Sequence, residues 1–121
     1  MADPLTERII GAAIEVHRII GPGLLESIYE EALCHEFSLR GMTFEQQVTV
    51  DVVYKEQVIK GHRLDLLVEG EVVVELKSVS RLPDVAMAQL LSYLKVTGLK
   101  RGLLVNFGLE RLIDGVNRIS L

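Results

Sequence analysis

The sequence predicts an α/β (α+β) protein in which helices flank a mixed β-sheet. Two observations lead to this fold class. Apolar residues recur at three- and four-residue spacings over residues 5–40 and again over 83–96, as in helices that bury one face. Between and after these segments, over 48–77 and 102–121, short runs rich in valine and leucine favour strands.

The N-terminal part is expected to form two helices joined by a sharp break. The first runs from Leu5 to Ile20, and Asp3-Pro4 gives it a capped start. Gly21-Pro22-Gly23 must end it, because proline lacks a backbone donor and glycine adopts conformations that other residues avoid. The second runs from about Leu24 to Arg40, with Gly41 at its C-terminal cap. Its predicted buried face consists of Leu25, Ile28, Tyr29, Ala32, Leu33 and Phe37.

After Gly41 the helical spacing gives way to alternation, and antiparallel strands are expected. These strands begin near Val48, at Val58 and at Val72, with a hairpin turn at 54–57 and a tight two-residue turn at Glu69-Gly70. The remaining predicted elements are a helix over Pro83 to Val96 that buries Val85, Ala88, Leu91 and Leu94, a strand over Gly102 to Phe107, and a short strand near Val116 to Leu121.

Length and composition indicate one domain over residues 1–121, because a chain of 121 residues suffices for a single layered core. The apolar runs are too short for a membrane-spanning helix, and the N-terminus does not resemble a signal peptide. The single cysteine, Cys34, cannot form an internal disulfide, so we expect the protein to be cytoplasmic. We expect Cys34 itself to be buried as a small apolar side chain.

The formal net charge of −4 argues against a surface that attracts nucleic acid everywhere, but the charges are unevenly distributed. Residues 1–51 carry nine acidic and three basic side chains, whereas residues 52–121 carry eight acidic and ten basic ones. Any phosphate-binding surface is therefore expected in the second half. The basic residues nearest the chemical motifs there are Arg63, Arg81, Lys95, Lys100 and Arg101.

The run from Val72 to Lys77 places a carboxyl and an ammonium group in an otherwise apolar strand. Because side chains alternate along a strand, Glu75 and Lys77 are expected on the same face as Val73. Pairing about the preceding turn sets Asp65 opposite Glu75 or within one register step of it. Two converging carboxylates are costly unless a proton or cation neutralises them, and a hard divalent metal with oxygen ligands fits. The alternative is an exposed ion pair between Glu75 and Lys77.

Three motifs in this chain resemble those of known nuclease families. Asp65, nine intervening residues and Glu75-Leu76-Lys77 resemble the D…ExK motif of the PD-(D/E)XK nuclease superfamily. Gln89 and Tyr93, four residues apart on one helical face, are similar to the QxxxY element of its RecB-like and Cas4-like branch. The run from Gly23 to Tyr29 matches the pattern of the GxxExxY protein family. This resemblance implies a restriction-endonuclease-like core.

In that fold an acidic residue on the first core helix often completes the metal site. The resemblance implies that Glu26 has this role. Glu30 lies one turn further along the same helix and is an alternative, and a solvated helix carboxylate is the simpler interpretation of either. His17 also resembles a histidine of the family, and is expected to support the site indirectly or to be structural.

The resemblance therefore implies a Mg²⁺- or Mn²⁺-dependent nuclease acting on nucleic acid, with DNA favoured over RNA. The expected catalytic residues are Asp65, Glu75 and Lys77, the expected metal ligands are Glu26, Asp65 and Glu75, and the expected substrate contacts are Gln89 and Tyr93. The alternative, from another functional class, is a non-catalytic module that keeps the nuclease scaffold to bind a protein or nucleic acid. A homo-oligomer is left open in both cases.

Overall fold

The structure, a computed structural model, describes residues 3–121. Its elements are α1 (Pro4–Ile20), α2 (Glu26–Leu39), β1 (Phe44–Tyr54), β2 (Gln57–Val68), β3 (Val72–Lys77), α3 (Val85–Thr97), β4 (Arg101–Asn106), the 3₁₀ helix η1 (Leu112–Gly115) and β5 (Val116–Ser120). The predicted order of helices and strands is confirmed, and η1 is the one element here that the spacing does not predict. Among these described residues, none of the helices is both long and apolar enough to cross a membrane.

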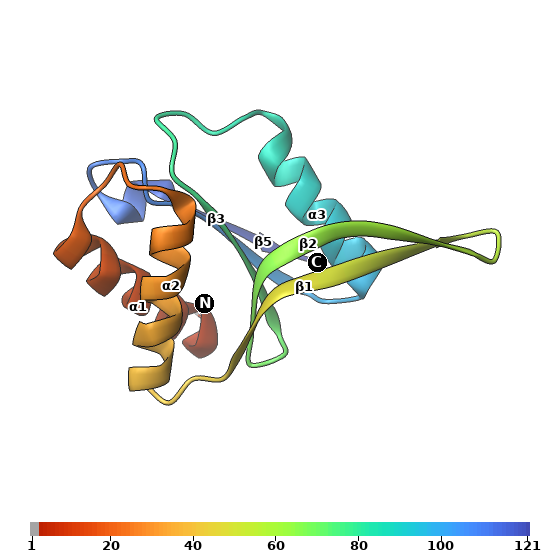
Figure 1. Ribbon diagram of the computed structural model, residues 1–121, viewed down its shortest axis with the longest axis horizontal. Helices are drawn as coiled ribbons and strands as arrows, with labels where there is room; N and C mark the ends of the chain where they lie inside the picture. Colours follow the sequence, from red (N-terminus) through yellow and green to blue (C-terminus); the bar gives the residue numbers. More distant parts are fainter. Residues whose placement is uncertain (1–2) are drawn as a thin grey trace.

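The five strands form one mixed sheet in the order β1-β2-β3-β4-β5. Strands β3 and β4 are parallel and are connected through α3, whereas the other neighbouring strands are antiparallel. The distal half of the β1–β2 hairpin projects from the body as a long arm (Figure 1). The predicted α+β class with a mixed sheet is therefore confirmed.

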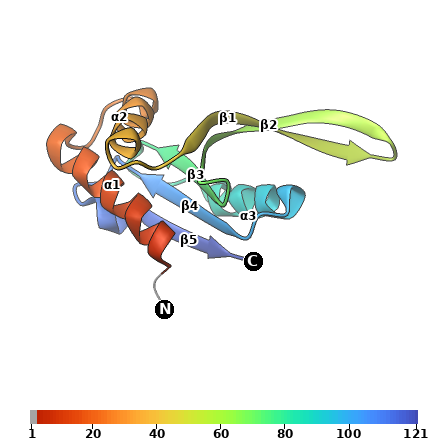
Figure 2. The same cartoon turned by 90° about the horizontal axis from the view of Figure 1, so that it is seen from below.

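Two apolar cores lie on opposite faces of this sheet, with α1 and α2 on one side and α3 on the other (Figure 2). The first core includes Ile9, Ala13, Leu33, Phe37, Val72, Val74, Leu76 and Leu103. The second, smaller core includes Val50, Leu64, Val73, Ala86, Leu90, Leu94 and Leu104. Because Val73 faces α3 while its neighbours on β3 face α1 and α2, the alternation predicted for this strand is confirmed.

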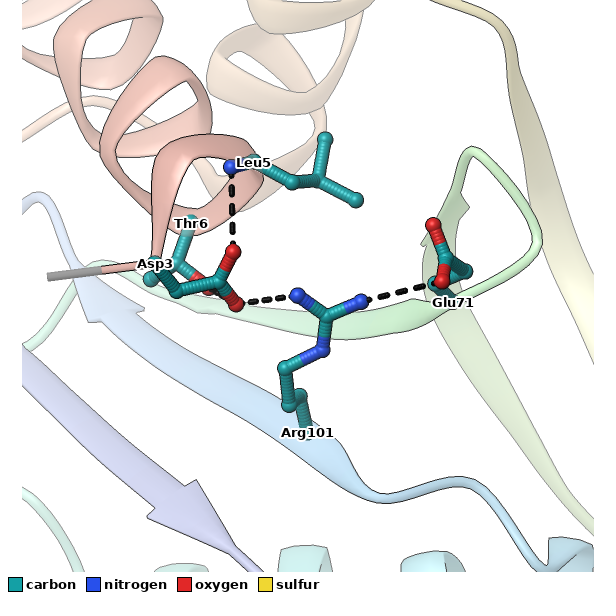
Figure 3. Close-up of polar contacts among 5 residues, drawn as sticks. All are labelled: Asp3, Leu5, Thr6, Glu71 and Arg101. Carbon is teal, nitrogen blue, oxygen red and sulfur yellow. Dashed lines mark hydrogen bonds and ion pairs between the residues drawn. The ribbon is translucent and has the colours of Figure 1, made fainter.

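A polar cluster fixes the start of α1 against the sheet (Figure 3). Asp3 caps the helix as predicted, accepting a hydrogen bond from the Leu5 backbone N–H at 3.1 Å and another from the Thr6 hydroxyl at 2.8 Å. Arg101 forms an ion pair with Asp3 and a second one with Glu71 at 3.2 Å. The hydrogen bond from Arg101 lowers the pKa of Asp3 to about 2. The guanidinium of Arg101 thus has two carboxylate partners.

The second helix differs from its predicted form at its N-terminal end. It begins at Glu26, and the side chains of Leu25 and Ile28 are exposed, at 72% and 41% of their surface. The Tyr29 hydroxyl explains the difference, because it accepts from the Leu24 backbone N–H at 3.1 Å and donates to the Gly21 carbonyl at 2.5 Å. These bonds hold the connection between α1 and α2 as a loop, so the buried face of α2 starts at Tyr29.

The third helix buries only part of the predicted face. Leu94 is buried as predicted, but Val85 and Ala88 are exposed, and the other buried positions are Ala86 and Leu90. The apolar residues of this helix surround most of its circumference, so spacing alone selects the inner face poorly. As a result, Tyr93 is half-buried beside the second core.

The segment after β3 is clamped to the end of β4. The Asn106 side chain donates to the Val79 carbonyl at 2.9 Å and accepts from the N–H groups of Val79 at 3.1 Å and Gly108 at 2.9 Å. The Phe107 N–H donates to the Lys77 carbonyl at 2.7 Å. These bonds extend the pairing of β3 and β4 beyond Lys77 and fix the backbone that carries its side chain.

Gly108 permits this close contact, and we predict that Gly108→Ala lowers the free energy of unfolding by about 1–3 kcal/mol. A Cβ at Gly108 would lie 2.2 Å from the Val79 carbonyl oxygen and 2.5 Å from its nitrogen, and both atoms belong to backbone. Gly11→Ala is the control, because a Cβ there would meet only the end of the Arg40 side chain at 3.4 Å, within α1. Urea unfolding checks both variants. Equal stability of the Gly108 variant and the wild type would contradict the clamp.

Candidate metal and nucleic-acid site

The carboxylate of Asp65 lies where β2 and β3 separate. Their ladder ends at the pair Leu66–Val74, and the next pair in this register would be Asp65 opposite Glu75. Here Oδ2 of Asp65 accepts the Leu76 backbone N–H at 2.8 Å, so the side chain satisfies a donor that the ladder no longer pairs. The register prediction for Asp65 and Glu75 is met, although the connecting turn, over 69–71, has three residues rather than two.

At Asp65, strand β2 switches from packing against one core to packing against the other. Leu66 and Val68 pack in the first core, whereas Leu64 packs in the second core with α3. A regular strand would place all three on one face, since they are two residues apart. The change marks a bend at Asp65, where the β1–β2 hairpin leaves the body of the sheet.

Strand β1 makes the same change opposite this point. Phe44 contacts the first core, whereas Val48 contacts the second. Between them Gln47, which lies opposite Asp65 in the register, has a φ of 51°, a left-handed conformation uncommon for residues other than glycine. The bend therefore includes both strands of the hairpin.

Glu75 is the buried acidic residue of the site, with 7% of its surface exposed. Its Oε1 atom is fully enclosed and has no hydrogen-bond partner. Burial, followed by the charge of Asp65, raises the pKa of Glu75 to about 9. Without a cation, this carboxyl therefore holds a proton at neutral pH. A buried oxygen without a partner, beside a second carboxyl group, fits the need of a small cation for oxygen ligands.

Glu75 opens onto a small cavity between β3 and α3. Its lining includes Lys77, Gln89 and Tyr93, which come from the end of β3 and from one face of α3. The cavity has a volume of about 30 Å³, enough for a water molecule or a small ion. Desolvation, followed by the charge of Glu75, raises the pKa of Tyr93. The structure thus brings Glu75, Lys77, Gln89 and Tyr93 to one cavity, with Asp65 beside Glu75.

Glu26 is not part of this cluster. Its side chain is exposed at the first position of α2, and residues 3–121 contain no group of three or more histidine, cysteine, aspartate or glutamate side chains that could hold a metal ion. The reason is the layer to which α2 belongs, since this helix packs on the face of the sheet opposite α3. Its N-terminal end still lies near the site, because the Ser78 hydroxyl bonds to the Leu24 carbonyl.

Glu30, the alternative to Glu26, is held elsewhere. Its carboxylate accepts hydrogen bonds from the side-chain amides of Gln46 and Gln47, each at 3.0 Å. His17 does not line the cavity of Glu75. Its Nε2 lies 2.8 Å from the Leu109 carbonyl oxygen, and its ring is buried near Phe107. Cys34 is buried as expected, and desolvation raises the pKa of its thiol to about 11.

The predicted phosphate-contacting residues do not all lie at the site. Arg101 pairs with Val72 at the start of β3, whereas Lys77 at its end pairs with Asn106, so Arg101 and the preceding Lys100 lie at the opposite end of the sheet. Arg63 on β2, Arg81 in the connection after β3 and Lys95 on α3 are exposed.

Two residues of the site are absent from the predicted set. His62 lines the cavity, and its ring stacks on that of Tyr93, with 4.7 Å between centroids and 4° between planes. Asn106 is buried and fixes the backbone beyond Lys77. A polar residue just before the end of the apolar run 102–107 was the available signal for Asn106. His62 had no comparable signal, because its position depends on the bend of the hairpin.

Comparison with known proteins gives one family and a remote structural likeness. Residues 3–119 match the family described as the PD-(D/E)XK nuclease superfamily. Among curated proteins, none matches the chain at a significant level. A solved structure titled "Crystal structure of SSO0001" matches with a TM-score of 0.50 and 19% sequence identity, over 95% of this chain and 76% of that chain. At this identity, the likeness concerns the fold alone.

The buried carboxyl predicts a pH-dependent stability difference between the wild type and Glu75→Gln. The pKa of Glu75 rises from 4.5 in a solvated side chain to about 9 in the fold. Between these values the unfolded chain ionises Glu75 while the folded chain keeps the proton, so the wild type loses stability as pH rises. The glutamine variant has no such proton. Its stability relative to the wild type should therefore rise by at least about 1 kcal/mol between about pH 5 and 9.

The measurement is urea unfolding of both proteins in chelator-containing buffer across this pH range. The difference between the two proteins removes the contribution of every titrating group that does not interact with Glu75. Parallel pH profiles would mean that Glu75 is already ionised in the metal-free fold.

Proposed function

Because this chain belongs to the PD-(D/E)XK nuclease superfamily, we propose that it is a Mg²⁺- or Mn²⁺-dependent nuclease that hydrolyses phosphodiester bonds in nucleic acid. The observation that carries the proposal is the buried Glu75 oxygen without a partner, beside Asp65 and at a cavity of ionic size. A fold has no structural need for such an oxygen, since an apolar residue would be less costly there.

Asp65 and Glu75 would hold the ion through their carboxylate oxygens. A bound divalent ion supplies positive charge for the phosphoryl oxygens and acidifies water. Glu75 must lose its proton to act as a ligand, so the apparent affinity for the ion rises with pH. Glu26, the third ligand predicted from the family resemblance, would have to be recruited, because its side chain is exposed outside the cluster.

Lys77 and α3 would act on the substrate. The Lys77 ammonium lines the cavity at the end of β3, where it can offset charge that develops on the phosphoryl group or orient the attacking water. Gln89 and Tyr93 present an amide and a hydroxyl group at the same cavity and would contact the substrate strand. Their presence beside Glu75 supports a place for this chain in the RecB- and Cas4-like branch and in the GxxExxY family.

A specific observation also favours the non-catalytic alternative. Residues 3–121 bring two carboxyl groups together rather than three, and the projecting arm exposes Val53, Tyr54 and Val58. A module that binds a partner through this arm would need no complete metal site. We favour DNA over RNA as the nucleic acid for both candidate functions. A cleavage assay distinguishes the nuclease from the non-catalytic module.

Metal titration should rank the three carboxylates. We predict that Asp65→Asn and Glu75→Gln each weaken Mn²⁺ binding by at least about tenfold, because each removes an anionic ligand. Glu26→Gln should weaken it much less, and Glu30→Gln, whose carboxylate already has amide partners, is the matched control. Calorimetry near neutral pH in buffers of different ionisation enthalpy would also detect the proton that Glu75 releases. Equal losses for Glu26 and Glu75 would establish a three-carboxylate site.

Lys77→Ala should separate turnover from metal binding. We predict that cleavage falls by about two orders of magnitude or more while Mn²⁺ affinity is kept, because an electrostatic stabiliser is lost and no ligand is removed. Lys100→Ala is the control at the opposite end of the sheet. The assay follows single- and double-stranded DNA and RNA in Mg²⁺ and in Mn²⁺. Metal binding without cleavage of any of these by the wild type would favour the non-catalytic module.

A further inference from the structure

We propose that His62 and Tyr93 form a stacking platform for an unpaired base, so that the site takes single-stranded nucleic acid or a locally opened strand. This inference rests on the proposed nuclease function and adds the class of its substrate. It begins from an arrangement that packing does not require. An exposed histidine on the arm lies parallel to a half-buried tyrosine on α3, and both line the cavity of Glu75.

The stack leaves His62 accessible to a ligand. The two rings are 4.7 Å apart between centroids and within 4° of parallel, so they are stacked. His62 is nevertheless exposed to solvent as a residue. Tyr93 is supported from below by the second core. A flat group approaching from solvent would thus continue the stack on His62.

The size of the cavity decides what can approach. At about 30 Å³ it accommodates a water molecule or an ion, and a nucleotide is far too large to enter it. A strand must therefore lie across the rim, with a phosphate toward Glu75 and Lys77. The ring pair occupies that rim, next to the position where the scissile phosphate would lie.

A stacked base must present a free face to His62. Inside a duplex, neighbouring base pairs cover both faces of each base, so only an unpaired base can join the stack. Stacking of a base on an aromatic ring is tolerant of sequence, and removal of such a ring by alanine substitution typically weakens binding about tenfold or more. The platform thus predicts preference for single strands without strong preference for sequence.

The chain contains no tryptophan, which permits a direct test. His62→Trp introduces a single indole into the platform, and Leu39→Trp places one at an exposed position at the end of α2, outside the cavity and away from the arm. Oligothymidine and a duplex of equal length are titrated against both variants in Ca²⁺ buffer, with a gel to verify that the strands stay intact. We expect single strands to quench the fluorescence of the His62 variant strongly, and the duplex and the Leu39 variant to show little quenching.

Affinity gives the second readout. His62→Ala should weaken single-strand binding about tenfold and change duplex binding little, whereas His62→Phe should keep the wild-type affinity because its ring is retained. Unchanged single-strand affinity in His62→Ala, with cleavage by the wild type intact, would overturn the platform and leave the nuclease function standing. Absence of both binding and cleavage in the wild type would overturn the function as well.

Discussion

The burial of the Glu75 carboxyl within β3 is the constraint on which the arrangement of the site depends. This strand is covered on both faces, by α1 and α2 on one side and by α3 on the other. An ionised carboxylate in such a place costs several kcal/mol unless a partner compensates it, and Asp65 adds repulsion instead. Only a proton or a cation resolves the conflict, so the protonation of Glu75 and the occupancy of the site are linked.

Two separate sets of polar contacts hold the two ends of the β3–β4 strand pair. At one end Arg101 joins the start of α1 to the turn between β2 and β3 through Asp3 and Glu71. At the other end Asn106 holds the segment after Lys77. The apolar residues between these ends pack on both faces of the sheet. The end of the strand pair that carries Glu75 and Lys77 is therefore supported by a well-packed segment.

Local patterns predicted those parts of the site that depend on one strand. Alternation along β3 suffices for Glu75 and Lys77, since it follows from backbone geometry. Asp65 required more, because a two-residue turn would have set it opposite Val74. The three-residue turn, with positive φ at Glu69 and Gly70, sets it opposite Glu75.

The sequence patterns did not predict the features that depend on tertiary contacts. The buried face of α2 begins at Tyr29 because its hydroxyl bonds hold Leu24 in the preceding loop. His62 reaches Tyr93 only because the hairpin bends at Gln47 and Asp65. Glu26 was assigned by family resemblance, which places a carboxylate on a helix but does not specify where its side chain points in this chain.

The tip of the hairpin lies apart from both cores that hold the domain together. Val50 and Leu64 still pack in the second core, but further along the arm the turn at Lys55 and Glu56 is exposed and contacts neither core. Extra residues there would lengthen a solvent loop at a small entropic cost, since this cost grows only slowly with loop length. The tip is therefore a natural point of attachment for a peptide tag or a fluorescent label, and the arm is free to differ in length between proteins that share this site.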